Sequence, residues 1–116
     1  MTEAAQSIAH TLREIRRMPY GTARTAAAES VARRVEAEGP RDLLPEALLD
    51  LIEAYTFAGE GPKSFTAFAR TIRLWDESPE LFDSSDERNL FWEFKWVAGD
   101  LPDYPEISRP QAEALL

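Results

Sequence analysis

Apolar residues along this chain recur at intervals of three and four, which places their side chains on one face of an α-helix. The first run of this kind is Ala5, Ile8, Leu12 and Ile15. Pro and Gly residues interrupt the pattern several times, and no stretch shows the alternation typical of a strand. The pattern therefore predicts an all-α chain. The predicted helices lie near residues 5–18, 22–38, 43–58, 62–78, 84–98 and 108–116.

The predicted boundaries carry residues that start and stop helices. Pro45 is placed in the first turn of its helix, where the missing N–H costs little. Ser84 and Glu87 have the spacing of a capping box, and a second pair of this kind begins at Ser108. We therefore expect the last two helices to begin at these serines. Gly99 is expected to end the fifth helix.

A short sequence pattern recurs forty residues apart. The segment EAYTFAGEGP at 53–62 aligns with EFKWVAGDLP at 93–102, and the order helix, turn, helix repeats at the same offset. A fixed period of this length indicates stacked helical hairpins, an α-solenoid. The sequence thus predicts one helical-repeat domain over residues 1–116. Its hairpin units are expected at about 3–39, 43–79 and 84–116, the last of them truncated.

The second unit resembles a tetratricopeptide repeat. Leu51, Tyr55, Gly59 and Phe68 stand at the spacing which that family uses for its large, aromatic, turn and second-helix positions. The period here is longer than the 34 residues usual in the family. The resemblance implies a right-handed stack of antiparallel helical hairpins with about five or six helices.

In the tetratricopeptide family, the first helix of each hairpin lines a concave groove that holds a peptide or protein. Carried over by position, this groove face would hold Gln6, Ala9, Arg13 and Arg16, then Glu46, Leu49, Glu53 and Thr56, then Asp86, Asn89, Glu93 and Trp96. The groove would be acidic in the second and third units, with Trp96 as an aromatic platform. Such a surface suits a partner segment that carries Arg or Lys. The alternative is an ordinary solvated helix face with one half-buried tryptophan.

Aromatic residues crowd the third unit. Phe91, Trp92 and Val97 correspond by the forty-residue offset to apolar positions of the second unit, so we expect them to pack between hairpins. The truncated unit offers them little partner surface, and two alternative functions follow. The chain is then an assembly module that forms a homodimer through residues 84–116, or a regulatory docking fragment of a larger chain.

Charge is distributed unevenly over the chain, whose net charge is −8. Residues 1–40 carry six arginines and five glutamates, whereas residues 41–116 carry seven basic and sixteen acidic groups. Nucleic acids and anionic membranes require a basic surface, so neither is expected as a partner. The short basic face of the first helix, Arg13, Arg16 and Arg17, is expected to form salt bridges with the acidic hairpins.

The residues that carry most enzyme chemistry are scarce. Cysteine is absent, and His10 is the single histidine, so no zinc ligand set is visible. The segment GEGPKS at 59–64 lacks the Gly directly before Lys that a phosphate loop requires. The acidic segment 75–87 lacks the alternating ligands of a calcium loop and is expected to be a solvated connection. The sequence therefore predicts a non-enzymatic protein- or peptide-binding module without cofactor or metal.

The remaining expectations concern location. No apolar run approaches the ~20 residues needed to span a bilayer, and the N-terminal segment lacks the basic start and apolar block of a signal peptide. A cytoplasmic protein is expected. The excess of arginine over lysine and the many alanines are typical of a GC-rich bacterial genome.

Overall fold

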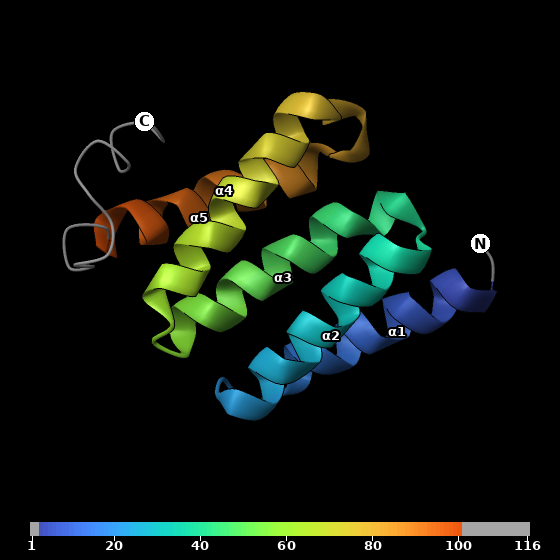
Figure 1. The fold of residues 1–116 in the computed structure, drawn as a ribbon, viewed down its shortest axis with the longest axis horizontal. Coiled ribbons are helices and arrows are strands. Elements are labelled where there is room, and N and C mark those ends of the chain that lie inside the picture. The colour runs from blue at the N-terminus through green and yellow to red at the C-terminus, as the bar shows by residue number, and fades with distance from the viewer. Residues whose placement is uncertain (1–2, 101–116) are drawn as a thin grey trace.

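The computed structural model describes the backbone of residues 3–100 and the side chains of residues 3 and 5–94. Five α-helices and two short 3₁₀ helices occupy this part of the chain (Figure 1): α1 Glu3–Arg17, α2 Thr22–Glu38, η1 Arg41–Leu43, α3 Leu44–Phe57, α4 Gly61–Glu77, η2 Pro79–Leu81 and α5 Ser84–Asp100. These residues contain no strand, which confirms the all-α prediction. The predicted sixth helix, from Ser108, lies outside the described residues.

Helix α3 lies at the centre of the fold and contacts α2, α4 and α5. Helices α1 and α2 pack as one hairpin, and α3 and α4 pack as the next (Figure 1). In that view α2 and α4 lie toward the viewer, and α1 and α5 lie behind them. None of the described helices is long and apolar enough to cross a membrane.

The core is built from the apolar stripes that the spacing predicted. Ile8 and Leu12 of α1 pack into the same buried cluster as Leu48 and Ile52 of α3 and Phe68 of α4. Helix α2 contributes the small residues Ala28, Val31, Ala32 and Val35, which allow close approach of its neighbours. Because neighbours surround α3, most of its residues are buried, and its acidic side chains emerge together along one stripe.

Helix α5 docks through a face different from the one predicted. Leu90 is buried in the core, and the ring centroid of Phe94 lies 5.8 Å from that of Phe68. Phe91 and Trp92 are instead exposed, at 63% and 54% of their surface. The prediction that these two aromatics pack between hairpins is therefore wrong. A helix that turns residues 90 and 94 inward must turn 91 and 92 away, because each residue rotates about 100°.

Helix α5 begins at Ser84, as predicted, but its capping residues differ from the predicted ones. The backbone N–H of Asp86 donates to Asp83 Oδ1 at 2.7 Å, and the backbone N–H of Asp83 donates to Asp86 Oδ2 at 3.1 Å. This reciprocal pair is a capping box. It lies one residue before the predicted pair, Ser84 and Glu87, because aspartate caps a helix as well as serine does. The helix also continues through Gly99, where we expected it to end.

Candidate functional site

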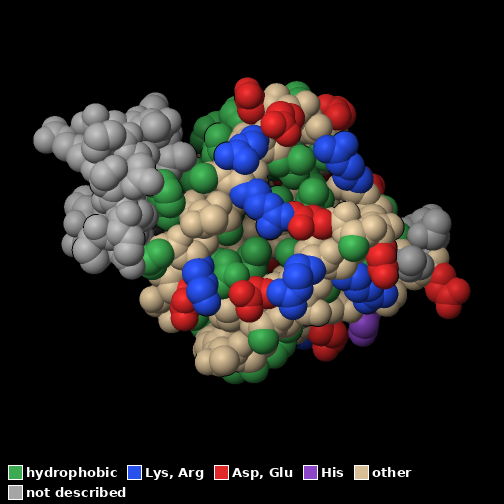
Figure 2. Space-filling view, viewed as in Figure 1, with side chains coloured by type: hydrophobic (Ala, Val, Ile, Leu, Met, Phe, Trp, Pro, Cys, Tyr) green, Lys and Arg blue, Asp and Glu red, His purple; other side chains and the backbone are tan. Residues whose placement is uncertain are grey.

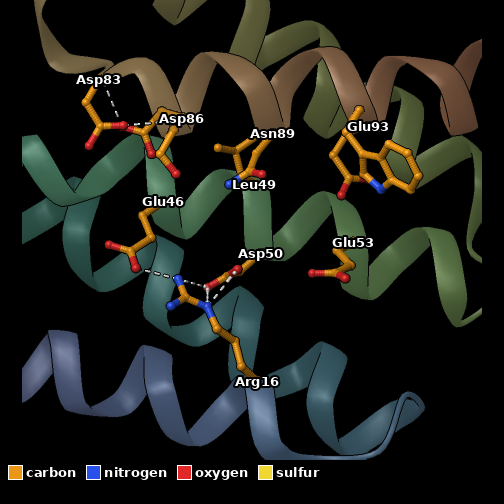
Figure 3. Close-up of a pocket in the computed structure, with 11 residues that line it drawn as sticks. Arg16, Glu46, Leu49, Asp50, Glu53, Asp83, Asp86, Asn89 and Glu93 are labelled. Atoms are coloured by element: carbon orange, nitrogen blue, oxygen red, sulfur yellow. Dashed lines mark hydrogen bonds and ion pairs between the residues drawn. The ribbon is translucent and has the colours of Figure 1, made fainter.

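A pocket of about 520 Å³ lies between α3 and α5, and one residue of α1 reaches into it (Figure 3). We call it the acidic pocket. Its lining residues are Arg16, Glu46, Leu49, Asp50, Glu53, Asp83, Ser85, Asp86, Asn89, Trp92 and Glu93. Among these described residues six are acidic and one is basic. The pocket therefore has a negative potential, which Arg16 offsets in part.

The acidic pocket brings together six of the eight residues predicted for the groove: Glu46, Leu49, Glu53, Asp86, Asn89 and Glu93. The two others are not part of its lining. Arg13 is exposed on α1, and the side chain of Trp96 lies outside the described residues. Arg16, one turn beyond Arg13 and also on the predicted groove face, is the α1 residue that reaches the pocket.

Sequence reasoning missed three of the lining residues that bear on chemistry. Asp50 lies four residues after Glu46 and three before Glu53, so helical spacing alone would have placed it on the same stripe. The sequence places Asp83 in a predicted solvated connection, whereas in the structure it caps α5 and lines the pocket. Trp92 was assigned to packing, and no signal in the sequence separated it from Trp96.

Arg16 forms the main ion pair of the acidic pocket. Its Nε donates to both carboxylate oxygens of Asp50, at 3.2 and 3.1 Å, and its guanidinium also pairs with Glu46 (Figure 3). Burial alone would lower the pKa of Arg16, but the hydrogen bonds that Arg16 donates to Asp50 and Glu46 outweigh this effect and raise the pKa above its ordinary value. Arg16 therefore stays cationic, and the predicted salt bridge between the first helix and the acidic hairpin is confirmed for this residue.

Asp50 is the buried partner of this ion pair. Burial raises its pKa to about 6, against the opposing effect of Arg16, and the nearby charges of Glu46 and Glu53 raise it further. The guanidinium of Arg16 thus favours the charged form of Asp50 and opposes the effect of burial.

The carboxylate of Glu53 contacts two residues of the first hairpin, Tyr20 and Arg24. The hydroxyl of Tyr20 donates to Glu53 Oε1 at 2.8 Å, and Arg24 Nη2 lies 3.9 Å from Oε2. The guanidinium of Arg24 in turn lies 4.2 Å from the centroid of the Tyr20 ring. These contacts fix the carboxylate of Glu53 at the edge of the pocket.

Glu93 differs from every other acid of the pocket. It is only 6% exposed, and its Oε2 is enclosed without a hydrogen-bond donor from the described residues. Figure 3 shows its side chain projecting from α5 toward α3. Burial raises its pKa to about 7, and the charges of Glu53 and Asp50 add to this effect. A buried carboxylate without a partner is costly in a folded protein, so Glu93 is the least satisfied acid of the pocket.

The arrangement is suited to holding a cation. Its carboxylates accept hydrogen bonds, and one of them, Glu93, both lacks a donor and exchanges its proton near neutral pH. In the part of the chain that the structure describes, no group of three or more His, Cys, Asp or Glu side chains is arranged to hold a metal ion.

The face formed by α2 and α4 has a different character (Figure 2). Basic and acidic side chains alternate there, and Arg70 of α4 pairs with Glu36 of α2. Lys63 also lies 3.4 Å from Glu60. The positive charges of this face are thus paired with nearby acids, whereas in the acidic pocket the negative charges outnumber the positive one.

Comparisons of this chain with protein-family models, with curated proteins and with solved structures gave no match. The resemblance of the second unit to a tetratricopeptide repeat therefore rests on its sequence spacing.

Proposed function

We propose that this chain is a non-catalytic helical-repeat module that binds a basic segment of a protein or peptide in the acidic pocket. In this proposal the hairpins α1–α2 and α3–α4 stack as tetratricopeptide-like units, and their first helices face the partner. The observation that carries the proposal is the lining of the pocket, where one guanidinium offsets six carboxyl groups. A partner with arginine or lysine side chains supplies the missing positive charge.

The contacts of the two carboxylates beside Glu93 support binding over catalysis. Carboxyl groups with raised pKa values also occur in hydrolases, where a second carboxylate must be free to act on the substrate. Here the neighbours of Glu93 already accept hydrogen bonds from the protein itself, Asp50 from Arg16 and Glu53 from Tyr20. The pocket thus offers charge complementarity without a second unengaged carboxylate beside Glu93.

Fluorescence anisotropy with labelled peptides tests the proposal. Peptides that contain arginine or lysine are expected to bind, with an affinity that falls as salt is added, and peptides in which citrulline or glutamine replaces the basic residues are not. The variant Glu46→Gln/Glu53→Gln is expected to bind the basic peptides at least tenfold more weakly.

The matched control is Asp76→Asn/Glu77→Gln, which removes the same charge from exposed positions of α4. The control is expected to bind like the wild type. Equal losses in both variants would show that net charge alone attracts the peptides. Failure of every basic peptide to bind would contradict the proposal.

Self-association through residues 84–116 is a second candidate function. It is favoured by the exposure of Phe91 and Trp92 on α5. The rings of Phe91 and Trp75 meet in a T-shaped arrangement, with centroids 6.2 Å apart. Sedimentation velocity over a wide concentration range tests it. A dimer that Phe91→Ser dissociates would support this function, and a monomer at all concentrations would contradict it.

A further inference from the structure

We infer that the acidic pocket is a receptor for a single arginine side chain, whose guanidinium binds Glu93 and Glu53 and lies against the indole of Trp92. This inference rests on the proposed function and names the group that the pocket selects. It follows from which carboxylates of the pocket are already engaged and which one is not.

The part of the pocket nearest α1 is already filled. Arg16 donates to both oxygens of Asp50 and also pairs with Glu46, so one guanidinium of the chain itself already engages these two carboxylates (Figure 3). The same contacts show that an acid of α3 in this pocket binds a guanidinium through hydrogen bonds. The buried carboxylate oxygen that has no donor from the described residues therefore lies further along α5, at Glu93, beside Glu53 of α3.

Glu93 is the anchor of the inferred subsite. Its side chain is more than nine-tenths buried, projects into the pocket, and has an enclosed oxygen with no donor from the described residues. Glu53 lies across from it on α3 and accepts a hydrogen bond from the neutral hydroxyl of Tyr20. The Arg24 guanidinium lies 3.9 Å from the Glu53 carboxylate. A cation that donates to Glu93 and Glu53 together removes the cost of an unpaired buried charge.

The geometry of the subsite selects a guanidinium over an ammonium ion. A guanidinium presents five N–H donors in a fixed plane and can donate to two carboxylates on facing helices at once, whereas an ammonium presents three donors on a single nitrogen. Trp92 follows Asn89 around α5, lines the same pocket and is 54% exposed. A planar guanidinium gains a further contact on an aromatic face, whereas a strongly hydrated ammonium gains less.

NMR titration with Nα-acetyl-arginine amide tests the inference, because it needs no knowledge of the partner. Addition of this probe to the full chain is expected to shift the indole N–H signal of Trp92 and the backbone signals of Glu53 and Glu93. Nα-acetyl-lysine amide is expected to bind severalfold more weakly. Nα-acetyl-citrulline amide, which has the same shape without the charge, is expected to cause no saturable shift.

The variant Glu93→Gln is expected to weaken binding of the arginine probe at least tenfold, while the control Glu77→Gln leaves it unchanged. Circular dichroism establishes that both variants are folded, and Glu53→Gln provides a second test at a less buried position. Wild-type affinity in both Glu93→Gln and Glu53→Gln, or equal binding of the citrulline probe, would overturn the inference.

The inference and the proposed function can fail separately. If basic peptides bind and lose affinity in Glu46→Gln/Glu53→Gln, but the arginine probe causes no shift near Glu93, the arginine subsite is wrong and the module still binds basic segments. If neither the peptides nor the probe binds, both are wrong.

Discussion

Replacing Glu93 by glutamine should change how the stability of this protein depends on pH. Glutamine has nearly the same shape as glutamate and cannot ionise. The carboxyl group of Glu93 is buried among other acids, and its pKa is raised from 4.5 to about 7. The folded state therefore binds a proton at this site more tightly than the unfolded state does.

The sign and size of the effect follow from this difference. For an acid whose folded pKa is raised, stability is highest below the unfolded pKa, falls as pH rises from 4.5 to about 7, and then stays level. At about 1.4 kcal/mol for each pKa unit, ionisation of Glu93 costs the folded state roughly 3 kcal/mol. Asp50, with a pKa raised to about 6, produces a change of the same sign, but it is present in both proteins and cancels in their comparison.

Urea unfolding followed by circular dichroism measures the effect. Between about pH 5 and about pH 8, the free energy of unfolding of the wild type should fall by roughly 2–3 kcal/mol more than that of Glu93→Gln. The buried amide of glutamine also needs hydrogen bonds, but that cost does not vary with pH and leaves the difference intact. Glu77→Gln, at an exposed site, should follow the wild type. If Glu93→Gln also follows the wild type, Glu93 titrates normally and the description of the pocket is wrong.

Two further predictions use the same unfolding assay. Arg16→Leu should lower the free energy of unfolding by about 2 kcal/mol, because it leaves Asp50 buried without its cation, and the partial exposure of Arg16 moderates the loss. The control Arg17→Leu should change the free energy of unfolding by less than about 0.5 kcal/mol. Equal effects of the two substitutions would contradict the role of the ion pair. Asp83→Ala should lower the free energy of unfolding by about 1 kcal/mol, because it removes the cap of α5, whereas Ser84→Ala should have little effect. A larger loss in Ser84→Ala than in Asp83→Ala would show that Ser84 is the cap.

Much of the fold could be predicted because local spacing determines it. The second helix was predicted at Thr22–Glu38 and lies there, since Gly21 and Gly39 bound a continuous run of helix-forming residues. The buried stripe of α1 likewise follows from steps of three and four along the chain. The superhelical stacking of hairpins remains a prediction, because it depends on contacts between distant units that local spacing does not determine.

The site could be predicted only in part, and the reason lies in α5. The acidic stripe on α3 follows from spacing, since one face of that helix carries the acids and the rest is apolar. Helix α5 has aromatic residues on several faces, so its sequence alone does not determine which face docks. The packing of Leu90 and Phe94 on the core decides this, and it exposes Phe91 and brings Trp92 to the pocket.

The crystal structure of this chain with a short arginine-containing peptide would test the central claim most directly. The account predicts that one guanidinium of the peptide lies in the acidic pocket within hydrogen-bond distance of Glu93, while Arg16 keeps its contacts with Asp50. A peptide bound on the face formed by α2 and α4, with Glu93 still unpaired, would contradict it.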